Sequence, residues 1–201
     1  MAEMSQAVKQ DLRFATTPEH LVALARRRFL ACERISLEEL AAELGVSRAT
    51  AYRWVGNAEQ LAGRVIVGLV DATFARTLRE GQGEGVERIV DVTARGLRYV
   101  ASSKAYHAFL ERDPQKALRI VASKEGPVQA RTIAHHEWLL REELQHGRLV
   151  LPVDPHTMAY ALVRVAESFL YADVIAGEEP DLEKAVEIIR LMLGGRAGID
   201  T

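Results

Sequence analysis

The run GVSRATAYRWVG, residues 45–56, holds the side chains with the clearest binding chemistry in the sequence. Arginines, hydroxyl residues, a tyrosine and a tryptophan lie close together there. An arginine guanidinium can donate two hydrogen bonds to the O6 and N7 atoms of guanine. Hydroxyl groups and the backbone N–H groups at a helix start can bind phosphate oxygens. This composition therefore favours contact with double-stranded DNA.

The same run also comes close to the G-x-S-x-G nucleophile elbow of serine hydrolases, with Ser47 as the nucleophile. The elbow requires a strand before the serine, a helix after it and an oxyanion hole beside it. Here the segment LEELAAEL precedes the serine and has the pattern of a helix. The sequence also lacks a P-loop, a His-Glu-x-x-His motif and a Cys-x-x-Cys motif. We therefore expect no enzyme activity and no cofactor, with a hydrolase as the disfavoured alternative.

Two short helices are expected to position the run. Ser36 is the predicted N-cap of a helix over 37–44 that Gly45 ends, and Ser47 is the predicted N-cap of a helix over 48–55. Helices this short are marginal alone, so packing must hold them. Two short helices joined by a turn that contains glycine form a helix-turn-helix, whose second helix can enter the major groove.

The side chains that remain outside this packing are the candidate DNA contacts: Arg48, Thr50, Tyr52, Arg53 and Trp54, with Ser36 and Ser47 as caps that could also contact phosphates. Trp54 could equally be part of the core. Arg26, Arg27 and Arg28 could reach the flanking backbone, but successive positions spread around a helix and favour a solvated face. Residues 1–60 contain eight basic and eight acidic residues, so this segment lacks the basic excess of many DNA-binding domains.

Composition sets the limits on the remaining classes. The chain has 201 residues, of which 48% are hydrophobic and 27% charged, and its formal net charge of −2 gives no bulk attraction to nucleic acid or membrane. Cys32 is the only cysteine, which excludes an internal disulfide, and its apolar surroundings predict burial. The first residues lack the apolar segment of a signal peptide, and no apolar run is long enough to span a membrane. We expect a cytoplasmic protein without membrane contact.

The whole chain has the pattern of an all-α protein with about nine or ten helices. We expect a three-helix helix-turn-helix domain over 1–60 and a ligand-binding and dimerisation domain over 61–201. The predicted helices cover 18–31, 37–44, 48–55, 58–80, 86–102, 104–111, 114–123, 127–147, 155–177 and 179–194. GQGEG (81–85) is the predicted hinge between the two parts, and the glycine-rich end after residue 194 is expected to be frayed.

The predicted helices over 155–177 and 179–194 are apolar on nearly every side, so we expect their outer faces to pack against a second copy of the chain. A monomeric bundle with both helices at its centre is the alternative. Arg164 and Glu167 are expected to pair inside this region or at its interface, because isolated buried charge is costly. The predicted homodimer interface consists of Leu162, Val163, Ala166, Leu170, Val186, Ile189 and Leu193.

Aromatic and histidine side chains of the second half could line a largely apolar cavity for a small molecule. The candidates are Tyr99, Tyr106, His107, Phe109, His135, Trp138 and Phe169, for each of which an ordinary core or surface position is the alternative. Glu143-x-x-His146 has a spacing found in di-iron bundles, but those sites need two such motifs. We expect no metal.

The segment GVSRATAYRWVGNAEQL, residues 45–61, resembles the recognition region of TetR-family transcriptional regulators, with Ser47, Tyr52, Trp54, Glu59 and Leu61 at matching positions. Residues 126–181 resemble the regulatory domain of the QsdR-like branch of that family, and the resemblance extends from about residue 18 to 193. Two positions depart from the family pattern, since its usual lysine falls at Ala58 and its usual phenylalanine at Val55. The missing lysine implies weaker or differently placed contact with the DNA backbone.

The resemblance implies a homodimer that binds a palindromic DNA operator through Arg48, Thr50, Tyr52, Arg53 and Trp54. It also implies that a small effector in the C-terminal domain tilts the helix over 58–80 and releases the DNA, as in a repressor. A dimeric helical protein that binds a small molecule without a DNA role is the non-enzymatic alternative. The outward positions of the two arginines in the recognition segment count against it.

Overall fold

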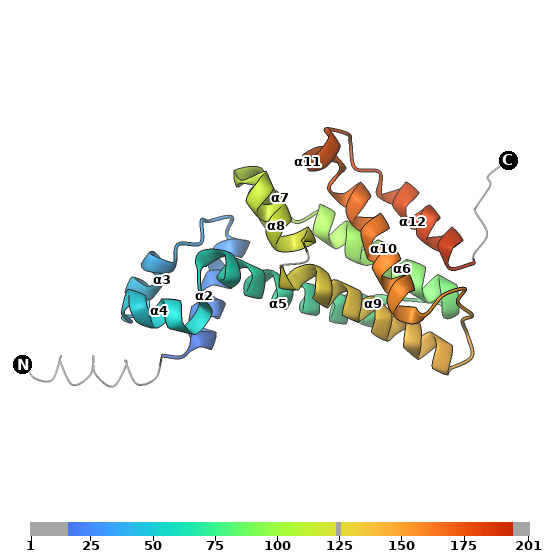
Figure 1. Cartoon of the computed structure of the whole chain (residues 1–201), viewed down its shortest axis with the longest axis horizontal. Helices are drawn as coiled ribbons and strands as arrows, with labels where there is room; N and C mark the ends of the chain where they lie inside the picture. The colour runs from blue at the N-terminus through green and yellow to red at the C-terminus, as the bar shows by residue number, and fades with distance from the viewer. Residues whose placement is uncertain (1–15, 124–125, 195–201) are drawn as a thin grey trace, which may run out of the picture. The chain divides into compact units, whose positions relative to one another are not determined.

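The computed structural model describes residues 16–123 and 126–194, and within these ranges every regular element is an α-helix (Figure 1). The all-α prediction is confirmed. The predicted fraying of the glycine-rich end concerns residues that lie outside the described ranges. The chain forms two compact units, Met1–Ile66 and Val67–Thr201.

The first unit contains α2 (Pro18–Leu30), α3 (Leu37–Glu43), α4 (Arg48–Val55) and the first turns of α5 (Ala58–Glu80). Helix α2 packs against α3 and α4, and α3 packs against α4. Apolar side chains spaced three or four apart on each helix meet in a small core, because these positions share one helix face. This core includes Leu21, Ala25, Phe29, Leu40, Ala51, Val55 and Leu61.

The predicted caps fix where these short helices begin. The Ser36 hydroxyl accepts a hydrogen bond from the Glu39 backbone N–H, and the Ser47 hydroxyl accepts one from Thr50 at 3.1 Å. Gly45 has a φ of +68°, the left-handed conformation that lets the chain turn between α3 and α4. The helix-turn-helix layout predicted from the sequence is therefore present.

The prediction that Cys32 is buried is wrong, because its side chain is exposed. Helix α2 ends at Leu30, so Cys32 belongs to the turn that follows and not to the apolar face of the helix. Its φ of +60° and the hydrogen bond from its N–H to the Phe29 carbonyl, 3.0 Å long, belong to that turn.

The second unit contains the rest of α5 and the helices from α6 onward: α6 (Gly85–Ala101), α7 (Lys104–Arg112), α8 (Pro114–Ala122), α9 (Pro127–Gln145), α10 (Pro155–Leu170), α11 (Ala172–Ala176) and α12 (Leu182–Met192). Helix α10 packs against α9 and α12, and α12 packs against α6. Figure 1 shows α10 crossing this group of helices. The central cluster includes Ile89, Val92, Leu139, Leu140, Leu162 and Ile189.

The single helix predicted over 155–177 is interrupted at Tyr171, which separates α10 from α11. Tyr171 has a φ of −107° and a ψ of 18°, so the backbone leaves regular helical geometry there. The last helix begins at Leu182, because the Asp181 side chain caps it by accepting a hydrogen bond from Lys184 N–H at 2.9 Å. The predicted start at 179–180 was therefore early.

The hinge predicted at GQGEG (81–85) does not separate the two compact units, because their boundary falls at Ile66–Val67 within α5. The segment is instead tied into the second unit. The Gln82 N–H donates to Asp91, and the Gly85 N–H donates to the Glu143 carboxylate at 2.7 Å. A functional boundary at residue 60 stays a prediction.

Burial in the chain's own core removes part of the predicted dimer interface. Leu162, Val163, Ile189 and Leu193 are no more than 2% exposed, and all four belong to the central cluster of the second unit. The sequence pattern could not separate the inner face of an apolar helix from its outer face. Ala166, Leu170 and Val186 keep partial exposure and stay candidates.

Candidate DNA-binding site and effector domain

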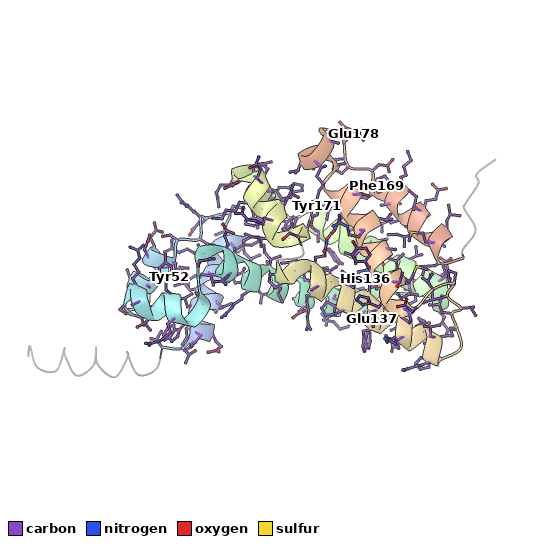
Figure 2. All side chains as sticks on the ribbon, in the orientation of Figure 1. Tyr52, His136, Glu137, Phe169, Tyr171 and Glu178 are labelled. Atoms are coloured by element: carbon purple, nitrogen blue, oxygen red, sulfur yellow. The ribbon has the colours of Figure 1, made fainter. Side chains whose placement is uncertain are left out.

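The recognition helix α4 buries one side and exposes the other. Ala51 and Val55, four residues apart, are fully buried, whereas Tyr52 and Arg53 are exposed. Figure 2 labels Tyr52 on the exposed surface of this unit. Trp54 is half-buried, and its carbonyl accepts a hydrogen bond from Arg64 at 3.1 Å. The exposed side of α4 thus offers a guanidinium and a phenol to a partner.

The hydroxyl groups at the start of α4 are engaged with each other and with the helix. Ser47 Oγ and Thr50 Oγ1 lie 2.8 Å apart, and Ser47 also accepts the cap hydrogen bond. A helix, α3, precedes Ser47, and the described residues hold no strand that could present it as a nucleophile. The arrangement is that of a helix cap with a phosphate-accessible hydroxyl, not of a nucleophile elbow.

Arg48, the first residue of α4, is held by two neighbours. Its Nη2 atom lies 2.6 Å from the Glu38 carboxylate of α3. Its guanidinium carbon lies 5.6 Å from the centre of the Tyr52 ring. The side chains of Arg48 and Glu38 are 66% and 55% exposed, so this ion pair faces solvent.

The arginines of α2 are also paired with acidic residues of α3. Arg27 lies 2.9 Å from Glu43, and Arg28 lies 2.7 Å from Glu43 and 3.3 Å from Glu39. The hydrogen bond from Arg28 holds the pKa of the Glu43 carboxyl below its usual value. These guanidinium groups join α2 to α3, which makes them poorly available to DNA. Among the described residues, Arg53 makes no ion pair.

The predicted effector-binding residues fall into separate groups in the second unit. Tyr106 and Phe109 of α7 have ring centres 6.4 Å apart, and the Tyr106 hydroxyl lies 2.7 Å from that of Tyr171. Burial raises the pKa of Tyr106 well above its usual value. Figure 2 labels Tyr171 on α10 beside α7 and α8. The sequence did not single out Tyr171, because it reads as one more residue of a long apolar helix.

A buried carboxylate lies on the same stretch of α10. Glu167 accepts hydrogen bonds from Gln129 Nε2 of α9 at 2.8 Å and from Arg164 at 2.9 Å. Burial raises the pKa of Glu167 above its usual value. The predicted pairing of Arg164 with Glu167 is confirmed, and the two tyrosines and this carboxylate form one polar cluster, here called the tyrosine–glutamate cluster (Tyr106, Gln129, Arg164, Glu167, Tyr171).

A second group joins α5 to α9. The His135 ring stacks on Phe74 at 4.2 Å, and Trp138 meets the same ring edge-on at 6.2 Å. The Asp71 carboxylate lies 2.6 Å from Arg131 and 2.7 Å from His135, and Arg131 holds its pKa below the usual value. This α5–α9 clasp (Asp71, Phe74, Arg131, His135) was not predicted, since its members are far apart in sequence.

The other predicted effector residues lie elsewhere. Tyr99 of α6 donates to the Glu80 carboxylate and carries the Arg76 guanidinium over its ring at 4.1 Å. His107 Nε2 lies 2.6 Å from the Ala101 carbonyl, and Phe169 is half-buried on α10 (Figure 2). The predicted residues therefore do not converge on one site.

The groups that suggested a metal have other partners. Glu143 is fully buried and bound by Arg88 and Arg148, while the His146 ring bonds to the Glu142 carbonyl at 2.7 Å. In the described part of the chain, no three histidine, cysteine, aspartate or glutamate side chains are placed to hold a metal ion. Nor does any helix there have the length and apolar character needed to cross a membrane.

A helix-turn-helix unit followed by an all-helical unit is the architecture of one-component transcriptional regulators. The family profile described as "Tetracyclin repressor-like, C-terminal domain" matches residues 84–194. The solved structure of the R. erythropolis transcriptional repressor QsdR, from the TetR family, is 30% identical. It superposes with a TM-score of 0.86 over 92% of this chain and 97% of that chain.

Two less similar structures share the fold alone. E. coli NemR in its reduced form is 18% identical, with a TM-score of 0.56 over 90% of this chain and 100% of its own. A SmeT–triclosan complex is 18% identical, with a TM-score of 0.52 over 92% of this chain and 94% of its own. A search of curated protein sequences gave no match.

The chain belongs to the TetR family of transcriptional regulators, as the resemblance predicted. The family fold is that of ligand-responsive DNA-binding proteins, which are transcription factors and not enzymes.

Proposed function

We propose that the chain is a repressor that binds a palindromic operator as a homodimer and is released by a small, largely apolar effector. The observation that carries this proposal is the exposed side of α4, where Arg53 and Tyr52 point away from a core that the helix closes with Ala51 and Val55. An exposed arginine on the second helix of a helix-turn-helix is the group that reads guanine in a major groove.

The DNA contacts follow from the same helix. Arg48, Tyr52 and Arg53 face the groove, and Thr50 and Trp54 support them at the backbone. The hydroxyl groups of Ser36 and Ser47 lie at helix starts, where phosphate oxygens are favourably bound. Residues 1–60 act as the DNA-binding domain, and residues 61–201 act as the effector and dimerisation domain.

The homodimer forms through the outer faces of α10 and α12. Tyr160 and Leu191 expose 49% and 48% of their surfaces there, and Ala166, Leu170 and Val186 add partly exposed apolar area. A two-fold dimer presents two recognition helices to successive major grooves, about 34–36 Å apart.

The effector binds beside the tyrosine–glutamate cluster. Tyr106, Phe109 and Tyr171 supply aromatic surface, while Gln129 and Glu167 supply hydrogen-bonding groups for one polar end. Sites for small molecules in proteins have this mixture of apolar walls and few polar groups. The similar fold of SmeT is known with triclosan, a small molecule, which fits an effector of this kind.

The α5–α9 clasp supplies the link between effector and DNA. Asp71 and Phe74 of α5 are held by Arg131 and His135 of α9, the helix that also provides Gln129 to the tyrosine–glutamate cluster. An effector that shifts α9 therefore shifts α5, which continues into the DNA-binding unit. Operator affinity falls because two half-sites must be met together, provided that the effector binds the two arrangements differently.

Fluorescence anisotropy with duplexes from upstream of the protein's own gene tests this proposal. Wild type should bind with an affinity that falls steeply as salt rises, because phosphate contacts release counterions. Arg53→Ala should lose binding or relax its sequence preference. Arg79→Ala, a change of another exposed arginine in α5, is the control and should keep wild-type affinity.

A wild-type chain that binds no duplex, including any selected from random sequences, would refute the DNA-binding role. An effector that binds tightly and leaves operator affinity unchanged would refute the release mechanism. Sedimentation of Leu191→Glu beside wild type tests the dimer, since a charge on the proposed face should shift the chain towards the monomer.

A further inference from the structure

The ion pair between Glu38 and Arg48 lies at the DNA-facing edge of the first unit. Arg48 begins the recognition helix, and its guanidinium is held between the Glu38 carboxylate at 2.6 Å and the Tyr52 ring at 5.6 Å. Glu38 comes from the first turn of α3 and has no other ion-pair partner among the described residues. Both side chains are exposed, so the pair is not part of the folded core.

Exposed ion pairs of this kind contribute little to stability, because water and salt screen them. Stability therefore does not explain an acidic side chain placed against a DNA-reading arginine. Its effect must be sought in binding, where a carboxylate beside a phosphate backbone is repelled and an arginine already paired has less charge to offer.

The consequence differs between specific and non-specific DNA. Non-specific binding depends on phosphate contacts alone, and each contact releases counterions. A neutralised arginine adds little to that kind of binding. A guanine that offers both O6 and N7 gives two directed hydrogen bonds, which can replace the two lost from the carboxylate. Only the correct base therefore compensates for opening the pair.

We propose that Glu38 is a specificity-determining residue, which holds Arg48 away from phosphates until a guanine at the right position displaces it. This inference rests on the proposed DNA-binding function. Acidic groups that disfavour wrong partners are a recognised route to specificity, since specificity is a difference between two affinities. The balanced charge of residues 1–60, with eight basic and eight acidic residues, then serves discrimination instead of bulk attraction.

The test compares Glu38→Gln with Glu39→Gln on two duplexes. One duplex is enriched from random sequences by the wild-type protein, and the other is a scrambled version of it. Glu39 is a matched control, because it lies next to Glu38 in α3 and carries the same charge but pairs with Arg28. Arg28 keeps its 2.7 Å contact with Glu43 when Glu39 is changed.

Glu38→Gln should tighten binding to the scrambled duplex about tenfold and to the enriched duplex about twofold, so the specificity ratio falls about fivefold. The salt dependence on the scrambled duplex should steepen by about one phosphate contact, since Arg48 is then available to it. Glu39→Gln should change both affinities by the same factor. In an Arg48→Ala background, Glu38→Gln should behave like the control.

Equal effects of Glu38→Gln and Glu39→Gln on the specificity ratio would overturn the inference while leaving the proposed DNA binding intact. So would a fall in the ratio that persists without Arg48. If the wild-type protein enriches no duplex, the proposed function fails and this inference fails with it.

Discussion

Two carboxylates bound by arginine have opposite settings in this chain. Glu143 is 0% exposed and receives hydrogen bonds from the Gly85 N–H, Arg88 and Arg148, with distances from 2.5 to 3.1 Å. Glu38 is 55% exposed and faces a single arginine across 2.6 Å. The chemistry of the two pairs is the same, and only their contact with water differs.

That difference decides what each pair can do. A buried charge left without its partner has no access to water, so breaking the Glu143 cluster is costly. The Glu38 pair can open, because water solvates both groups as they separate. The buried cluster therefore fixes the geometry of the second unit, and the exposed pair is free to exchange its arginine with a ligand.

The largest effect is expected from Glu143→Gln, which removes the charge that Arg88 and Arg148 share. We expect a loss of about 3–5 kcal/mol in the free energy of unfolding, because two guanidinium groups keep their charge beside a neutral amide. Denaturation in urea, followed by circular dichroism, measures this loss. Glu142→Gln is the matched control, since Glu142 pairs with the same Arg88 at 3.1 Å but is partly exposed.

The stability that Glu143 provides should also depend on pH. Burial opposes its ionisation, but the hydrogen bonds from Arg148, the Gly85 N–H and Arg88 prevail and hold the pKa of Glu143 below its usual value. A carboxyl with a lowered pKa stabilises the fold above its unfolded pKa of about 4.3, and this contribution is lost as the pH falls further. The wild-type advantage over Glu143→Gln should therefore shrink in acid, and an advantage independent of pH would contradict this assignment.

Gly85→Ala should give the next largest loss, because Gly85 fills a place that admits no side chain. Its φ is +58°, and a Cβ atom there would lie 2.3 Å from the Arg148 carbonyl oxygen. We expect about 2–3 kcal/mol lower stability from backbone strain and displacement of Arg148. Gly96→Ala in the same helix should instead stabilise by up to about 1 kcal/mol, since nothing lies within 4 Å of its Cβ position. Equal losses in the two variants, again from urea denaturation, would rule out this explanation.

Local sequence signals predicted the first unit well. Ser36, Gly45 and Ser47 act through neighbours within a few residues, so their spacing alone located α3, the turn and α4. The same spacing placed Tyr52 and Arg53 outside, because Ala51 and Val55 had to face inward. Cys32 was misjudged because the end of α2 depends on one turn of backbone geometry.

Long-range contacts limited what could be predicted for the second unit. Glu143 meets Gly85 and Arg88 from more than fifty positions away, and Tyr106 meets Tyr171 at a separation of 65. No short-range pattern marks such pairs. Helix α10 reads as apolar on all sides, so the sequence could not show that Leu162 faces its own core.

Glu167→Gln sharpens the comparison from the other direction, because Glu167 is buried with less compensation than Glu143. Burial raises its pKa, so the fold resists its ionisation at neutral pH. Removing this charge should stabilise the protein by about 1 kcal/mol at pH 7. A raised pKa means that wild type gains stability as it binds the proton in acid, so the difference should vanish below about pH 4. Thermal unfolding at both pH values measures it, and a destabilised variant would contradict this account.

The smallest effect on stability is expected from Glu38→Gln, although its effect on DNA specificity is proposed to be large. The pair with Arg48 faces water on both sides, so its loss should change the free energy of unfolding by less than about 0.5 kcal/mol. Urea denaturation in low and high salt measures the change, which should be the same in both. A loss comparable to that of Glu143→Gln would place Glu38 in the folded framework and remove the distinction between the two pairs. A change in DNA specificity at unchanged stability would show that exposure to water lets the same ion pair act in recognition.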